Sequence, residues 1–298
     1  MIKTPVFKGC CTAIVTPFSN GAVDYDKMGE LIDLQYENGV SALVVCGTTG
    51  ENATLTQYEH EELIDFTCKY NNGRMKIIAG IGSNCSEKAL KFAKCAKHYG
   101  ADGTLMVTPY YNKTSQNGLI EHFTYVADRV DIPMILYNVP SRTGIGIKAE
   151  TYKKLSEHPN INGVKEASGD FSLIAATRSL CGDSLNIWSG NDDNTLPMMA
   201  MGALGVISVA SNIVPSVVSK LCALCLEGDF ASADKLMQKY APLFSTLFIE
   251  TNPMPVKAAM KLMGLCSGEM RLPLTNITDA SATKLINEMT AVDLKIKA

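Results

Sequence analysis

The sequence lacks any concentration of positive charge. Its 27 Lys and Arg residues are outnumbered by 30 Asp and Glu residues, and no segment is rich in Lys or Arg. Proteins that bind nucleic acids need a basic surface to neutralise phosphates, so this composition argues against nucleic acid as a partner.

The ten cysteines lack the spacing of a disulfide framework or of a metal site. Cys222 and Cys225 form a CxxC pair, but no second pair and no histidine pair accompanies it. A structural zinc site needs such a second pair, so we interpret these two residues as packing within an apolar helix. Thiols without a framework are typical of the reducing cytoplasm, where we expect this protein to be.

Neither a signal peptide nor a membrane-spanning helix is expected. The N-terminus begins without the apolar stretch of a signal peptide. Residues 194–219 carry no charge and exceed the ~20 residues of a transmembrane helix. That segment is interrupted by Pro197, Gly202, Gly205, Asn212 and Pro215. We therefore predict a helix, a buried strand and a second helix there.

Short apolar runs recur through the first two thirds of the chain. Each is continuous rather than alternating, as expected of parallel strands that are covered on both faces. The eight runs are Thr12–Thr16, Ala42–Cys46, Lys76–Gly80, Thr104–Val107, Met134–Tyr137, Ile161–Lys165, Leu185–Trp188 and Val206–Val209.

Segments with helical periodicity lie between these runs. Residues 86–99 place most apolar side chains on one face, and Gly100 follows as a helix-ending residue. Residues 24–38 end in the same way at Gly39. Eight alternations of strand and helix predict an α/β fold, a (β/α)8 TIM barrel, which we assign to residues 1–227.

A doubly wound α/β sheet is the alternative fold. Such a sheet normally has a glycine fingerprint after an early strand, and none is complete here. Gly80 and Gly82 are followed by Cys85 where the third glycine would stand, and no GxxxxGK[ST] loop exists.

The remainder, residues 228–298, is predicted to be a C-terminal helical domain. Asp229–Phe248 and Pro255–Leu265 both carry apolar faces of helical period. Lys257 lies inside the second of these helices. Because that helix is amphipathic, we expect the Lys257 amine to reach solvent rather than to act in chemistry.

A second lysine stands at the end of the sixth apolar run. Lys165 follows Ile161–Val164, so a buried strand would carry its amine to a strand end. Removal from water disfavours the ammonium form and lowers the pKa. A neutral amine can attack a ketone and form a Schiff base, which serves as an electron sink. The alternative for Lys165 is a side chain that extends to solvent.

Polar residues follow four of the other predicted strands. These segments are Gly47–Glu51, Thr108–Asn112, Tyr137–Gly144 and Gly190–Asp193. In a (β/α)8 barrel, the active site forms at these strand ends. Hydroxyls that relay protons, the Lys165 amine and the Arg142 guanidinium would suit Schiff-base chemistry on a keto acid with a second, carboxylate-bearing substrate. Asp192 and Asp193 could instead cap a helix or bind a metal, but no third ligand is placed beside them.

Five motifs occur in the order of a known family. They are GTTGE (47–51), TPYYNK (108–113), YNVPSRTG (137–144), GVKEASGD (163–170) and SGNDD (189–193). With these motifs the chain resembles the 4-hydroxy-tetrahydrodipicolinate synthases, also called dihydrodipicolinate synthases. They belong to the pyruvate-dependent class I aldolases, which include N-acetylneuraminate lyase. The resemblance covers essentially the whole chain.

The resemblance implies a role for each catalytic residue. Lys165 would form the Schiff base with pyruvate, and Tyr137 would donate and accept protons. Thr48 and Tyr111 would relay protons, with Tyr111 reaching in from a neighbouring subunit of a homotetramer built as a dimer of dimers.

The resemblance also implies the substrate contacts. Thr49, Ile207 and the backbone of Gly190 would contact pyruvate. Arg142 would receive the carboxylate of L-aspartate 4-semialdehyde. No metal and no organic cofactor is implied, because the lysine itself provides the electron sink.

Other pyruvate aldolases remain the alternative. N-acetylneuraminate lyase and the 2-keto-3-deoxy sugar acid aldolases resemble this chain at Lys165 and Tyr137 but typically not at Arg142. A fixed guanidinium suits an acidic aldehyde better than a polyol. A catalytically inactive member that only binds ligands is a further alternative, against which the retained catalytic set argues.

A regulatory site follows from the same resemblance. In lysine-inhibited relatives, lysine binds at a dimer interface lined by residues matching Asn52, Ala53, Gln57, His60, Asn84, Lys88 and Tyr110. Position 88 in those enzymes is more often glutamate, which would pair with the ammonium of the effector. Lys88 presents a like charge instead, so we predict weak or absent inhibition by lysine.

Overall fold

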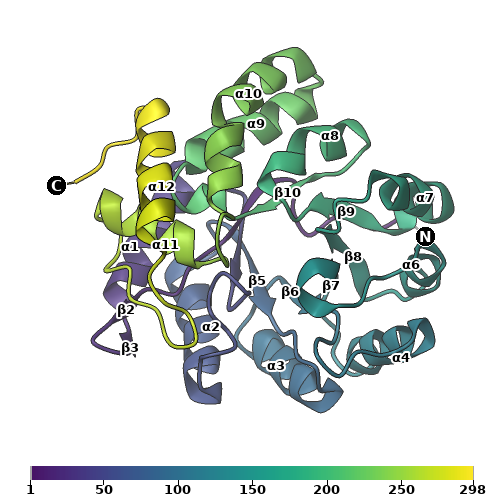
Figure 1. The fold of residues 1–298 in the computed structure, drawn as a ribbon. Helices are drawn as coiled ribbons and strands as arrows, with labels where there is room; N and C mark the ends of the chain where they lie inside the picture. The colour runs from purple at the N-terminus through teal and green to yellow at the C-terminus, as the bar shows by residue number, and fades with distance from the viewer. Residues whose placement is uncertain (1, 298) are drawn as a thin grey trace.

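Eight parallel strands form a closed barrel in the computed structural model, which describes residues 2–297. The strands follow one another around the barrel in chain order, and the first pairs with both the second and the last. They are β1 (Gly9–Ala13), β4 (Ala42–Val45), β5 (Lys76–Gly80), β6 (Gly103–Val107), β7 (Met134–Asn138), β8 (Ile161–Glu166), β9 (Asn186–Ser189) and β10 (Gly205–Ser208). The predicted (β/α)8 barrel is confirmed (Figure 1).

Seven of the predicted strands agree with the observed ones to within one residue at each end. The first prediction is wrong, because β1 covers Gly9–Ala13 and not Thr12–Thr16. Gly9 of β1 pairs with Gly205 of β10, and a Cβ atom on Gly205 would lie only 1.9 Å from the Gly9 carbonyl oxygen. This close backbone approach determines where β1 begins, and the apolar pattern does not reveal it.

Helices surround the barrel (Figure 1). They are α1 (Tyr25–Glu37), α2 (Gln57–Asn71), α3 (Ser86–His98), α4 (Gln116–Ala127), α5 (Pro140–Thr143), α6 (Ala149–Ser156), α7 (Phe171–Cys181), α8 (Thr195–Ala200) and α9 (Pro215–Glu227). The uncharged segment 194–219 contains α8, β10 and the start of α9, as predicted. Among residues 2–297, no helix has both the length and the apolar character needed to cross a membrane.

Three further helices follow the barrel: α10 (Phe230–Thr246), α11 (Met254–Met263) and α12 (Asp279–Ala291). In Figure 1 they form the green to yellow group on one side of the barrel, where α12 packs against both α10 and α11. The short hairpin of β2 (Phe18–Ser19) and β3 (Ala22–Val23) was not predicted. The division into domains at residue 228 stays a prediction.

Two apolar clusters hold the fold together. The larger lies between the strands and the surrounding helices, and the smaller fills the barrel interior. Within the interior, Phe7 stacks on Trp188 with ring centres 4.9 Å apart. Tyr137, Val139 and Ala167 belong to the interior cluster and also line the cavity described below. The apolar core of the barrel therefore forms part of the wall of the site.

Candidate active site

A small cavity of about 90 Å³ opens at the carboxyl ends of the barrel strands. It is the place where a (β/α)8 barrel forms its active site. Six of the predicted site residues line it: Thr48, Thr49, Tyr137, Arg142, Lys165 and Gly190. The fold thus brings together residues that the sequence separates by more than a hundred positions.

Lys165 extends into this cavity from β8 and is 5% exposed. Burial lowers the pKa of its amine from 10.5 to about 8, although the charges of Cys11 and Asp192 act in the opposite direction. At pH 7 roughly a tenth of such an amine is neutral, against less than a thousandth of an ordinary lysine. A fraction of the Lys165 amine is therefore neutral at this strand end.

Tyr137 lies beside Lys165 on the neighbouring strand β7, and the two residues are direct partners in the strand register. The Lys165 Nζ atom lies 4.4 Å from the centre of the Tyr137 ring. Burial raises the pKa of the Tyr137 phenol to about 12, partly offset by the positive charge of Arg142. The phenol therefore keeps its proton at neutral pH and can donate it to a neighbouring atom.

A buried network next to this pair fixes β7 to β8. Each carboxylate oxygen of Glu166 accepts from the Asn138 amide at 3.0 Å, and the Tyr152 hydroxyl donates to the same carboxylate at 2.7 Å. Asn138 and Glu166 are register partners that directly follow Tyr137 and Lys165. Because side chains alternate along a strand, the network faces the helices while the amine and phenol face the barrel interior. Sequence reasoning missed this network.

The acidic pair after β9 has a structural explanation. Asp192 is buried, and its carboxylate accepts from the Ser208 hydroxyl and from the backbone N–H groups of Val209 and Ala210, both at 3.0 Å. Burial raises the pKa of Asp192, and these hydrogen bonds oppose the rise. Within residues 2–297, no group of three His, Cys, Asp or Glu side chains is arranged to hold a metal.

The GTTGE turn is held from outside the barrel. The Thr49 hydroxyl accepts from the side-chain amide of Asn252 at 3.0 Å. The backbone carbonyl oxygen of Asn252 accepts from the Arg142 guanidinium at 3.2 Å. Asn252 also lines the cavity. Asn252 lies between the two helices predicted at 229–248 and 255–265, and nothing in its local sequence reveals a partner two hundred residues away.

Two of the predicted active-site residues, Ile207 and Tyr111, do not line this cavity. Ile207 packs in the interior cluster of the barrel. Tyr111 is 92% exposed in this single chain and has a positive φ of 68°. Tyr111 therefore does not line the cavity of its own chain.

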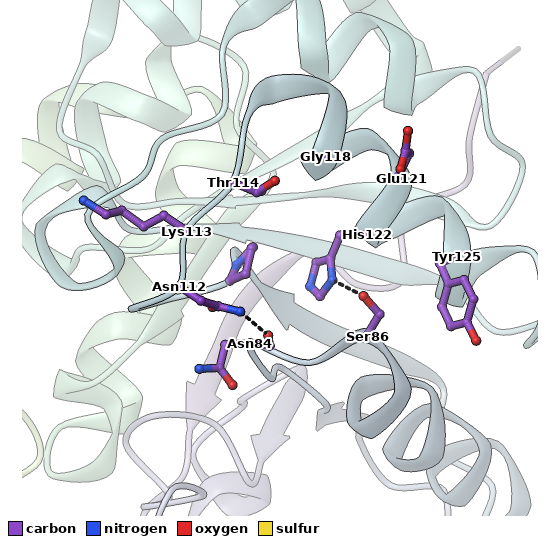
Figure 2. Close-up of a pocket in the computed structure, with 10 residues that line it drawn as sticks. Asn84, Ser86, Asn112, Lys113, Thr114, Gly118, Glu121, His122 and Tyr125 are labelled. Carbon is purple, nitrogen blue, oxygen red and sulfur yellow. Dashed lines mark hydrogen bonds between the residues drawn. The ribbon is translucent and has the colours of Figure 1, made fainter.

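The predicted regulatory residues differ in their surroundings. His60 is buried, where its Nε2 atom lies 2.8 Å from the Gly80 carbonyl oxygen. Asn84 lines a separate cavity of about 370 Å³ near α3 and α4, shown in Figure 2. In that cavity the Asn112 amide donates to the Asn84 carbonyl oxygen at 3.0 Å. Lys88 does not line it.

The prediction that the Lys257 amine reaches solvent is wrong. Lys257 is fully buried and paired with Glu51, whereas the amphipathic pattern of its helix predicted an amine in solvent. The face of α11 that carries Lys257 is covered by the GTTGE turn and by the chain after the helix. The segments that cover Lys257 are distant from it in the sequence, so helical periodicity could not predict its burial.

A buried, readily deprotonated lysine beside a protonated tyrosine at the strand ends of a (β/α)8 barrel defines a Schiff-base enzyme of the class I aldolase type. The comparisons with known proteins give the particular family. The profile of the dihydrodipicolinate synthetase family matches residues 6–292, and the chain belongs to that family.

Several relatives are similar over nearly their whole length. The 4-hydroxy-tetrahydrodipicolinate synthase of Thermoanaerobacter sp. strain X514 is 49% identical over 92% of this chain and 93% of its own. The crystal structure of dihydrodipicolinate synthase from Aquifex aeolicus has a TM-score of 0.96 at 47% identity, covering 98% of this chain and 100% of the other. The enzyme from Cyanidioschyzon merolae, solved with lysine bound, has a TM-score of 0.94 at 41% identity, covering 98% of this chain and 100% of the other.

These matches confirm the predicted family, fold and class of activity, a lyase that forms carbon–carbon bonds. They also favour the synthase over N-acetylneuraminate lyase, because the relatives named above are all synthases.

Proposed function

We propose that this chain condenses pyruvate with L-aspartate 4-semialdehyde through a Schiff base on Lys165. The observation that carries this proposal is the buried Lys165 amine, whose pKa of about 8 leaves it partly neutral, facing the protonated phenol of Tyr137. Attack on a ketone requires a neutral amine, and loss of water from the adduct requires a proton donor.

The steps follow from these two groups. The Lys165 nitrogen adds to the pyruvate ketone, and Tyr137 supplies the proton with which the hydroxyl leaves as water. The resulting iminium accepts the electrons of a methyl C–H bond, whose proton passes to the Tyr137 phenolate, and an enamine forms. The enamine carbon attacks the aldehyde of the second substrate. The amine of that substrate then attacks the imine carbon, which closes the ring and expels Lys165.

Arg142 and the threonine turn complete the site in this proposal. The Arg142 guanidinium would hold the carboxylate of the semialdehyde, and its contact with Asn252 orients it at the cavity. Thr48 would relay protons, while Thr49 and the Gly190 backbone would contact pyruvate. No metal or organic cofactor is required by this scheme, because the lysine supplies the electron sink.

A pair of assays tests this function. The protein should form product from pyruvate and aspartate semialdehyde in a coupled assay and should show no comparable cleavage of N-acetylneuraminate. The reverse ranking would assign the chain to the sugar acid aldolases. Activity with neither substrate pair, in folded protein, would support the binding-only alternative.

The assembly forms a second part of the proposal. Tyr111 is 92% exposed in the single chain, so we infer that it completes the site of a neighbouring subunit within a homotetramer. Two inactive variants, Lys165→Ala and Tyr111→Phe, should regain part of the activity when mixed and allowed to exchange subunits. If exchange is demonstrated and no activity returns, Tyr111 acts in its own chain or not at all.

We also propose that lysine inhibits this enzyme weakly or not at all. Lys88 presents a positive charge to an ammonium ligand, and its neighbour Glu87 is engaged by the Tyr125 hydroxyl. Half inhibition below about 1 mM lysine, an affinity of ~4 kcal/mol, would contradict this proposal. In the converse experiment, Lys88→Glu should increase sensitivity to lysine.

A cytoplasmic location is the remaining proposal. All ten cysteines are unpaired in the structure, which suits a reducing compartment. Fractionation of the source cells would test it.

A further inference from the structure

Lys257 lies in a fully buried ion pair next to the active site. Its Nζ atom is bonded to the Glu51 carboxylate and donates to the Glu269 carbonyl oxygen at 2.7 Å. Neither Lys257 nor Glu51 has exposed side-chain surface. Two charges removed from water in this way depend on each other, because either one alone would remain uncompensated. The Lys257–Glu51 ion pair therefore links helix α11 to the turn after β4.

Glu51 belongs to the turn that carries Thr48 and Thr49. The Glu51 N–H donates to the Thr48 carbonyl oxygen at 3.1 Å, and its φ of +58° lies in the region that residues other than glycine seldom adopt. Such a conformation persists only where the surroundings hold it in place. The Glu51 side chain is held by Lys257 and by the Arg271 N–H at 3.2 Å.

The same C-terminal segment also contacts the turn from the cavity side. Asn252, which precedes the helix that carries Lys257, donates to the Thr49 hydroxyl at 3.0 Å. Its carbonyl oxygen accepts from Arg142 at 3.2 Å. Residues 252–257 therefore contact both the turn after β4 and the segment after β7.

We propose that Lys257 is a positioning residue, which acts through Glu51 to fix the Thr48–Thr49 turn at the cavity. Residues 252–257 then help to position the two threonines at the cavity. The inference rests on the proposed function only in giving these two threonines a part in the reaction.

The variant Lys257→Met tests the proposal, because it keeps the bulk of the side chain and removes the charge. With Glu51 left unpaired, the turn should shift and both threonines should lose their positions. We expect kcat/KM for pyruvate to fall roughly tenfold or more, the scale on which small displacements act. Lys165 itself is unchanged, so borohydride at saturating pyruvate should still trap one adduct per chain.

Arg271→Met provides the matched control. The Arg271 guanidinium pairs with Glu59 and ties down the same C-terminal loop, but only its backbone touches Glu51. This variant should lose stability while keeping kcat/KM for pyruvate within about twofold of the wild type, since the turn stays supported. All rates are compared at a temperature at which circular dichroism shows each variant folded.

Glu51→Gln gives a second variant should Lys257→Met not fold. It removes the other charge, keeps an acceptor of similar size, and should lower kcat/KM for pyruvate in the same way. Wild-type kcat/KM in a folded Lys257→Met or Glu51→Gln protein would overturn the proposal, as would an equal loss in Arg271→Met. Absence of trapping in the wild type would instead refute the proposed function.

Discussion

Lys165 and Lys257 are both buried lysines that face an aromatic ring, yet their surroundings suit them to opposite tasks. The Lys165 Nζ atom lies 4.4 Å from the centre of the Tyr137 ring, and the Lys257 Nζ atom lies 4.5 Å from that of Phe18. Burial lowers the pKa of both amines. Neither burial nor the neighbouring ring therefore distinguishes Lys165, the proposed nucleophile, from the ion-paired Lys257.

The difference lies in the carboxylates. Glu51 is bonded directly to Lys257 and opposes the fall of its pKa, so that amine keeps its proton as half of an ion pair. The carboxylate that acts on Lys165 is that of Asp192, which is already occupied by the Ser208 hydroxyl and by two backbone N–H groups. A buried lysine becomes a nucleophile where no carboxylate is free to hold its proton.

The largest expected effect comes from replacing Lys165, the proposed nucleophile, by arginine, which stays charged. Lys165→Arg should abolish trapping by pyruvate and borohydride and lower turnover by roughly 10³-fold or more, because a guanidinium cannot act as the nucleophile. The fold should be intact by circular dichroism. Appreciable turnover in this variant would place the covalent chemistry elsewhere.

Replacement by methionine should destabilise the protein at Lys257 but not at Lys165. Lys257→Met leaves Glu51 buried without its partner and should lower the free energy of unfolding by about 3–5 kcal/mol. Lys165→Met removes an amine that is not bonded to a carboxylate and should leave stability unchanged or raise it. Denaturant unfolding of both variants at pH 7 measures the contrast. Equal destabilisation by the two substitutions would mean that Lys165 and Lys257 do not differ in their dependence on a carboxylate.

The effect of Lys165 on stability should depend on pH. Burial lowers the pKa of Lys165 from 10.5 to about 8, so between these values the unfolded chain binds the extra proton. The contribution of Lys165 to the free energy of unfolding should therefore rise with pH across this window, by about 3 kcal/mol in total. Unfolding measurements should show the advantage of Lys165→Met at pH 7 shrinking towards pH 10. A constant difference would mean that the Lys165 pKa is not lowered.

The reaction rate should follow the same titration. Schiff-base formation needs the neutral amine, so its rate at limiting pyruvate should rise about tenfold per pH unit below pH 8 and level off above it. Stopped-flow measurement of adduct formation gives this profile directly.

A smaller effect is expected at Arg142, which is exposed at the rim of the cavity. Arg142→Ala should leave pyruvate trapping intact and weaken turnover with aspartate semialdehyde by about 2 kcal/mol, the lower end for loss of a charge-assisted contact. Pyruvate trapping and turnover with aspartate semialdehyde must be measured on the same preparation. Equal damage to trapping and turnover would assign Arg142 a structural role.

The apolar runs of the chain were sufficient to predict the barrel and the strand that carries Lys165. Consecutive apolar residues are typical of a parallel strand covered on both faces, as in Ala42–Val45. The start of β1 could not be predicted in this way, because it depends on the contact between Gly9 and Gly205.

Long-range polar contacts were the main omission. Nothing near Lys257 in the sequence indicates Glu51, and nothing near Asn252 indicates Thr49, because each pair is joined only by the fold. The strand-end residues were predictable since a barrel gathers them at one end. The side chains that hold them are spread over the chain and follow no periodicity.

The most direct test of the contrast between the two lysines is to map the adduct formed with pyruvate. Protein treated with pyruvate and borohydride is digested, and the modified peptide is identified by mass spectrometry. We expect one reduced adduct per chain on Lys165 and none on Lys257. An adduct on Lys257, or fully active protein with no adduct, would contradict it.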